Sequence, residues 1–214
     1  MNSVPRLHLI SNRAICPLDQ FPGVAESATR GGVDAIHLRE PDLDVEDLRP
    51  FARELRERLH GTGARLLINR HIELACEIGA GVHLAEEQFE RISEARAALS
   101  DAALVGISIH DVETALRAQD AGVDYVIAGH VFETGSKPGQ AGRGLDFVTG
   151  VAAAISIPVI AIGGITPENT ADVRRAGAHG VAVLSGILAS DSPERMAAAY
   201  RTALECDEEQ SLEG

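Results

Sequence analysis

Eight short apolar runs, separated by helical patterns, constrain the fold of this sequence more than any other feature. Most of the runs are continuously apolar, which is typical of strands buried on both faces of a parallel sheet. The segments between them place apolar residues at steps of three and four, as a helix with one buried face requires. The alternation predicts an α/β fold. The runs lie at residues 6–11, 35–39, 65–69, 81–84, 103–109, 124–129, 158–163 and 180–185.

The number of strands favours a closed (β/α)8 TIM barrel over an open, doubly wound sheet. The first strand is also not followed by the Gly-x-Gly-x-x-Gly turn of dinucleotide-binding folds; "LISNRAICP" stands there instead. No linker-like tract divides the 214 residues. We therefore expect a single domain over residues 1–205, followed by a polar tail at 206–214.

Some local features predict how individual helices begin and end. Pro50 lies inside the helical pattern of residues 44–60, so this helix is expected to start late or to kink. Thr166, Pro167 and Gly177 are well placed to cap, start and end another helix. Only about a dozen residues separate the third and fourth strands, which leaves room for a degenerate helix.

Charge and composition exclude several classes of protein. The formal net charge of −13 argues against binding to nucleic acid or to an anionic membrane. No run of about 18 apolar residues predicts a membrane span. The three cysteines match no zinc spacing and leave one unpaired, which favours a reduced, cytoplasmic protein without a metal site. Homo-oligomer formation stays open, since exposed apolar faces cannot be separated from packed ones.

In a TIM barrel the chemistry lies on the loops after the strands. His130 follows the sixth strand, where an imidazole could carry a proton or could be purely structural. Glycine-rich loops after strands seven and eight are candidates for phosphate binding, and the less favoured alternative is that the glycines only make tight turns. Lys137 and Arg39 could supply positive charge, or could be solvated. The small residues of the two loops are Gly163, Gly164, Ser185 and Gly186.

Several motifs in their order along the chain resemble the thiamine phosphate synthase/TenI superfamily. They are "AIHLRE", "LLINR", "GVHLAEE", "VGISIHD", "GVDYVIAGHVFETGSKPG", "IPVIAIGGITPEN" and "GVAVLSGI", spread over residues 35 to 188. The resemblance implies a TIM barrel that handles a thiazole phosphate. It also implies one of two activities. The synthase joins thiazole phosphate to a pyrimidine pyrophosphate using Mg²⁺, and the TenI branch is a metal-free thiazole tautomerase.

Three motifs depart from the synthase pattern and favour the tautomerase. Pro41 replaces the lysine that would hold pyrophosphate, Arg70 replaces one metal aspartate, and "AEEQ" at 85–88 lacks the second. Glu86 or Glu87 could substitute for these carboxylates. His130 stands where synthases usually have proline, and the resemblance implies that it is the catalytic acid and base. The expected function is therefore a thiazole tautomerase without a cofactor, with a synthase or a non-catalytic thiazole-phosphate-binding protein as alternatives.

The resemblance also assigns contacts to the substrate. Two groups of residues match family positions, one for thiazole phosphate and one for pyrimidine pyrophosphate. The glycine-rich loop at 131–144 is predicted to close over the substrate. The first group is Thr134, Ser136, Gly164, Ser185 and Gly186, joined by Gly163 from the same loop, and the second is Arg39, Asn69, Ser108 and Lys137.

Overall fold

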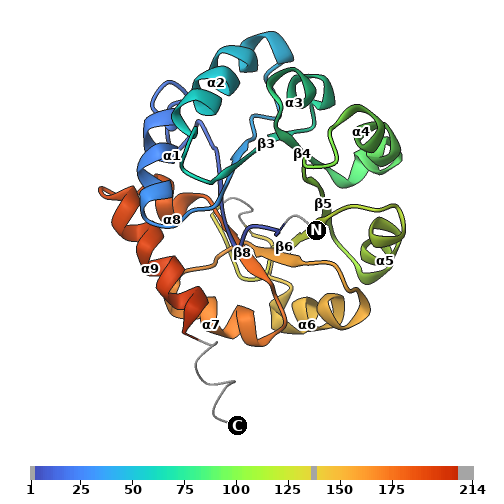
Figure 1. Cartoon of the computed structure of the whole chain (residues 1–214). Helices are drawn as coiled ribbons and strands as arrows, with labels where there is room; N and C mark the ends of the chain where they lie inside the picture. Colours follow the sequence, from blue (N-terminus) through green and yellow to red (C-terminus); the bar gives the residue numbers. More distant parts are fainter. Residues whose placement is uncertain (1–2, 136–138, 207–214) are drawn as a thin grey trace.

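The computed structural model describes residues 3–135 and 139–206, and these form a closed barrel of eight parallel strands (Figure 1). Each strand pairs with its neighbours in sequence, and β1 pairs with β8 to close the ring. The prediction of a single-domain TIM barrel is confirmed. The strands are β1 (Leu7–Ile10), β2 (Ala35–Leu38), β3 (Arg65–Asn69), β4 (Gly81–Leu84), β5 (Val105–Ile109), β6 (Tyr125–Gly129), β7 (Val159–Ile162) and β8 (Gly180–Val183).

The helices form an outer layer around the barrel (Figure 1). Their apolar faces and the outer faces of the strands make the main hydrophobic core. No helix of the described residues is long and apolar enough to cross a bilayer. The helices are α1 (Phe21–Arg30), α2 (Val45–Arg58), α3 (Ile72–Ile78), a 3₁₀ helix η1 (Glu86–Arg91), α4 (Ile92–Ala98), α5 (Val112–Asp120), α6 (Gly144–Ala154), α7 (Pro167–Arg175), α8 (Ser185–Leu188) and α9 (Pro193–Glu205).

Capping interactions determine where several helices begin, and helix α2 begins before Pro50 in spite of the proline. The Asp44 side chain accepts a hydrogen bond from the backbone N–H of Asp47 at 3.0 Å, so α2 begins at Val45 and contains Pro50. The predicted late start is therefore wrong, because this N-cap stabilises the first turn. The expected helix start at Thr166 and Pro167 is confirmed. The short connection between β3 and β4 holds α3, a helix of seven residues.

The inside of the barrel is packed with inward-facing side chains. A small cluster of mostly aliphatic residues fills part of it. Tyr125 belongs to this cluster, and three buried histidines lie beside it, on β1, β2 and β4. Space for the tyrosine ring exists because Gly106 has no side chain: a Cβ there would lie 2.1 Å from Tyr125 Cζ. Part of the lumen is therefore polar. In the sequence, the three histidines stand as single polar residues within otherwise apolar runs; they are His8, His37 and His83.

The first and last elements of the chain join to complete the barrel. Helix α9 packs against α1, and a Cβ at Gly31 would lie 2.1 Å from the Glu194 backbone oxygen. Arg201 of α9 donates hydrogen bonds to the Gly32 backbone oxygen at 2.6 Å and to Asp34 at 2.7 Å. Closure therefore depends on contacts between residues that lie far apart in the sequence.

Candidate active site

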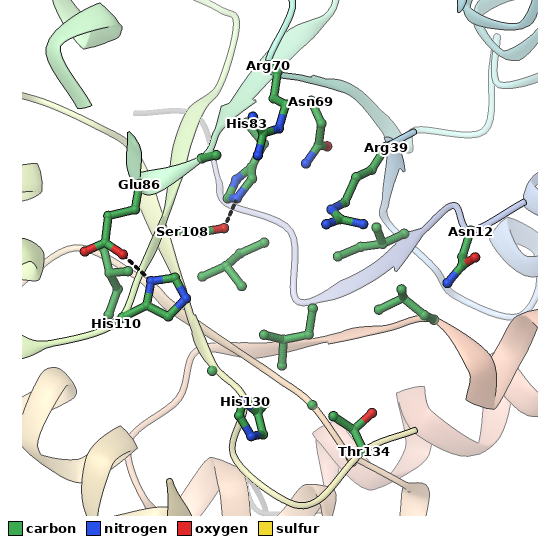
Figure 2. A pocket seen from close by; sticks show the side chains of 18 of the residues that line it. Asn12, Arg39, Asn69, Arg70, His83, Glu86, Ser108, His110, His130 and Thr134 are labelled. Atoms are coloured by element: carbon green, nitrogen blue, oxygen red, sulfur yellow. Dashed lines mark hydrogen bonds and ion pairs between the residues drawn. The ribbon is translucent and has the colours of Figure 1, made fainter. Parts of the chain in front are cut away.

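A cavity of about 390 Å³ opens at the carboxyl-terminal ends of the strands. This size is within the usual range for pockets that bind small molecules. Figure 2 shows Asn69, His83 and Ser108 on one side of the cavity and His130 with Thr134 on the other. We call the first three residues the polar wall. Aliphatic side chains also line the cavity, among them Ile10, Ile127 and Ile162.

The structure brings six of the predicted site residues together around this cavity. Ser136 and Lys137 lie outside the described residues, so their predicted contacts stay predictions. Gly164, Ser185 and Gly186 follow the expected strands but do not line the cavity. The six lining residues are Arg39, Asn69, Ser108, His130, Thr134 and Gly163.

Other lining residues were not among the predicted contacts. Asn12 was missed entirely; it follows β1, and its Oδ1 accepts a hydrogen bond from the Ala14 backbone N–H at 3.0 Å. An asparagine directly after a strand is typical of such a turn and was the available signal. The others lie at the ends of β3, β4 and β5, and of these Glu86 and Glu87 were considered only as substitutes for the metal carboxylates. They are Arg70, His83, Glu86, Glu87 and His110.

Charged side chains at the mouth are largely paired with one another. Glu87 accepts a hydrogen bond from Arg70 Nη2 at 2.5 Å. A hydrogen bond to its own backbone N–H, followed by the contact with Arg70, lowers the pKa of Glu87. Glu86 contacts His110 Nδ1 and accepts from Thr114 Oγ1 at 3.2 Å. Arg39 differs, because its guanidinium has no hydrogen bond or ion pair with any residue that the structure describes.

His130 comes directly after β6 and is 9% exposed. Its Nε2 lies 3.4 Å from the backbone oxygen of Gln140. Gly163 makes room for it, because a Cβ there would lie 2.4 Å from the Cβ of His130. The backbone of Gly163 also has a φ of 102°, which favours glycine. The loop after β7 thus lets His130 reach the cavity wall.

The polar wall is the upper end of a network inside the barrel. His83 Nε2 lies 2.9 Å from Ser108 Oγ, and His83 Nδ1 lies 3.1 Å from the Tyr125 hydroxyl oxygen. His37 Nδ1 lies 3.3 Å from the side-chain amide of Asn69. Burial lowers the pKa of His83 to about 3 and that of His37 well below 6.5. Both imidazoles are therefore neutral near pH 7.

The carboxylates at the mouth do not fit a magnesium site. Mg²⁺ prefers carboxylate oxygens in an octahedral arrangement. Here Glu86 is held by His110 and Thr114, and Glu87 by Arg70. No group of three or more His, Cys, Asp or Glu side chains among the described residues could hold a metal ion. Among the described residues that line the cavity, Arg39 and Arg70 carry positive charge.

Comparison with known proteins shows similarity along nearly the whole chain. The chain is 40% identical over 186 residues to the thiamine-phosphate synthase of Natronomonas pharaonis, covering 85% of this chain and 86% of that protein. It is 32% identical over 209 residues to the thiamine-phosphate synthase of Chloroflexus aurantiacus, covering 97% and 96%. The solved thiamine phosphate pyrophosphorylase from Pyrococcus furiosus superposes with a TM-score of 0.82 and 27% identity, covering 94% and 95%.

These comparisons correct the expected function. The assignment as a thiazole tautomerase is wrong, because the curated relatives, 32–41% identical over most of the chain, are thiamine-phosphate synthases. The prediction relied on His130 and on a few positions near the expected metal site. Those positions differ from the synthase pattern, but the similarity outside them is much more extensive.

The acid and base role given to His130 was part of the expected tautomerase reaction, whereas the place of His130 in the site is not tested by the comparisons and stays a prediction. The expected TIM barrel and the wider superfamily, in contrast, agree with the fold and with the matches. The model for the family described as thiamine monophosphate synthase matches residues 7–187. The chain therefore belongs to the thiamine monophosphate synthase family.

Proposed function

We propose that the chain is a thiamine-phosphate synthase, an enzyme that joins a thiazole phosphate to a pyrimidine diphosphate. The observation that carries the proposal is the similarity to the synthase of Chloroflexus aurantiacus, which covers 97% of this chain. The cavity supports it, because it lies at the end of the barrel where TIM-barrel enzymes place their chemistry.

The reaction makes a demand that the charges of the cavity can meet. A bond forms between the nitrogen of the thiazole ring and the methylene carbon on the pyrimidine. At the same carbon, the bond to the diphosphate oxygen breaks. Negative charge therefore builds up on the departing diphosphate, and a fixed cation beside it lowers the barrier. A guanidinium suits this role, because it can donate two parallel hydrogen bonds to phosphate oxygens.

Arg39 is the group that we assign to the diphosphate. It lines the cavity, and no other described residue competes for its guanidinium. Arg70 also lines the cavity, but its guanidinium donates a hydrogen bond to Glu87, so part of its charge is already paired. We therefore expect Arg39 to contribute more than Arg70 to diphosphate binding.

The thiazole phosphate is assigned to the opposite side, near the loop after β7. Gly163 and Gly164 have φ values of 102° and 65°, and a Cβ at Gly164 would lie 2.4 Å from the Glu133 backbone oxygen. A loop of this kind, which leads into the N-terminus of α7, is suited to binding an anion. Thr134 lines the cavity beside this loop and can donate a hydrogen bond. His130 is assigned a contact with the substrate.

The test is the synthesis of thiamine phosphate by the purified full chain, measured by chromatography. Both substrates are supplied, in parallel samples with Mg²⁺ and with EDTA. We expect product only when both substrates are present. No product in either sample would contradict the proposed function.

A pair of arginine variants tests the assignment of the diphosphate site. Arg39→Ala is expected to lower kcat/KM for the pyrimidine diphosphate by about 10²-fold or more, as loss of a charged contact in a transition state does. Arg53→Ala is the matched control, because Arg53 is exposed on α2 and pairs with Glu77 away from the cavity. Equal activity of the two variants would remove Arg39 from the site.

A further inference from the structure

Two buried histidines connect the bottom of the barrel to the polar wall. His8 Nε2 lies 3.0 Å from the backbone oxygen of Pro5, and His8 Nδ1 lies 2.9 Å from His37 Nε2. His37 Nδ1 in turn lies 3.3 Å from Oδ1 of Asn69. Both imidazoles have no exposed surface. The chain of contacts therefore runs from a backbone carbonyl, through two rings, to a residue of the cavity.

The number of hydrogens in this chain decides how the Asn69 amide is turned. Each of the three contacts needs one hydrogen, and a neutral imidazole carries one N–H. Burial lowers the pKa of His8 to about 4 and that of His37 well below 6.5, so both rings are neutral and together they supply two hydrogens. The Pro5 carbonyl can only accept. If Asn69 also presented its oxygen to His37, one contact would lack a hydrogen.

Turning the amide by 180° about its last torsion supplies the missing hydrogen. This rotation exchanges the oxygen and the nitrogen and leaves the shape of the side chain nearly unchanged. The Asn69 NH₂ group then donates to His37 Nδ1, His37 Nε2–H donates to His8, and His8 Nε2–H donates to Pro5. Each of the three contacts then has one hydrogen. The oxygen of Asn69 then faces the cavity.

The contacts of Tyr125 fix the direction of a second, shorter chain. Its hydroxyl is buried, and His83 is its only hydrogen-bond partner among the described residues. The hydroxyl must donate to His83 Nδ1, since otherwise a buried O–H would lack an acceptor at a cost of about 1–3 kcal/mol. The proton of neutral His83 is then on Nε2 and is donated to Ser108 Oγ. The Ser108 hydroxyl hydrogen is free to point into the cavity.

We propose that His8, His37, His83 and Tyr125 are positioning residues that turn the Asn69 oxygen and the Ser108 hydroxyl hydrogen toward the substrate. The polar wall then presents one acceptor and one donor to the cavity, and Figure 2 shows the contact of His83 with Ser108. A ring with an amino group beside a ring nitrogen is the complementary ligand, because it offers a donor next to an acceptor. This last step rests on the proposed function, which supplies an aminopyrimidine as substrate.

Nuclear magnetic resonance of the ligand-free chain with ¹⁵N-labelled histidine tests the orientation. Long-range proton–nitrogen correlations distinguish the two neutral tautomers and the imidazolium. At pH 7.5 we expect His8, His37 and His83 all to carry their proton on Nε2. A proton on His37 Nδ1, or an imidazolium at His8 or His37, would overturn the proposal.

A pair of asparagine variants provides the matched test. Asn69→Asp places a group that can only accept next to His37, so His37 is expected to gain a proton on Nδ1. Asn12→Asp is the control, because Asn12 lines the same cavity but contacts the backbone of Ala14. Its histidine signals should match those of the original chain. An unchanged His37 tautomer in Asn69→Asp would also overturn the proposal.

Ligand binding separates this proposal from the proposed function. Binding of 4-aminopyrimidine and of pyrimidin-4-one is compared by titration, and the amino compound is expected to bind at least about tenfold more tightly. Equal affinities would overturn the assigned donor and acceptor. Failure of the synthase assay, together with the expected tautomers, would contradict the proposed function while leaving the orientation of Asn69 and Ser108 in place.

Discussion

Acidification from pH 7.5 to pH 5.5 is expected to lower the free energy of unfolding by about 4 kcal/mol, owing to three buried histidines. Burial lowers the pKa of His8 to about 4, that of His83 to about 3, and that of His37 well below 6.5. At pH 5.5 these rings are still neutral in the folded chain. In the unfolded chain each titrates near pH 6.5 and has bound a proton.

The size of the effect follows from proton linkage. The stabilisation is complete above pH 6.5 and is lost as the pH falls toward the folded pKa values, because only the unfolded state gains protons in this range. One pH unit below 6.5, each histidine contributes a loss of about 1.4 kcal/mol. Three such losses are a large part of the roughly 5–15 kcal/mol by which a domain is stable. Partial burial also lowers the pKa of His71, which acts in the same direction.

Urea unfolding followed by circular dichroism at pH 7.5, 6.5 and 5.5 measures this loss. Carboxyl groups of the unfolded chain titrate near pH 4, so they contribute little in this range. His83→Gln should reduce the loss by about one third, since one of three groups is removed. His60→Gln, which changes an exposed histidine, should leave it unchanged. A change of less than about 1 kcal/mol between pH 7.5 and 5.5 would refute the reasoning.

Three further predictions concern the loops around the cavity. Gly163→Ala should reduce kcat/KM about tenfold or more, measured by steady-state kinetics. The added methyl carbon would lie 2.4 Å from the Cβ of His130 and would therefore displace this residue. Asn169→Ala should lower the free energy of unfolding by about 1–2 kcal/mol in urea titrations, because its amide donates to the Gly164 backbone oxygen at 3.0 Å. Arg70→Gly should change the free energy of unfolding by less than about 1 kcal/mol, because glycine tolerates the φ of 70° found at this position. The same variant should bind inorganic pyrophosphate more weakly in calorimetry. Unchanged binding would exclude Arg70 from the anion site.

The strands could be predicted from the sequence because each is a continuous apolar run that ends in polar residues. Predicted limits extended beyond the observed ones at Ser11 and Arg39, which follow their strands. A strand covered on both faces gives no signal for which side chains enter the barrel. For this reason His8 and Tyr125 were read only as members of apolar runs, although both face the lumen and support the cavity.

The site could be predicted only in part, for a similar reason. The family resemblance assigned Arg39, Asn69 and Ser108 to the substrate, and the structure brings all three around one cavity. Pairing across loops was not visible: Glu86 meets His110 and Glu87 meets Arg70 only after folding. Without these pairs, local departures from a motif were given too much weight, and the choice between the two activities of the family was wrong.

The pairing of β1 with β8 has a consequence for synthesis on the ribosome. One edge of β1 pairs with β2 early, but the other edge has no partner until β8 has been made about 170 residues later, a delay of roughly 9 to 35 s at typical rates of translation. Throughout this time the growing sheet has open edges that could pair with other chains. A nascent chain stalled before residue 180 should therefore bind chaperones and be cut by proteases. Once α9 has left the ribosome, chaperone binding and cleavage should stop within the time that the barrel needs to close.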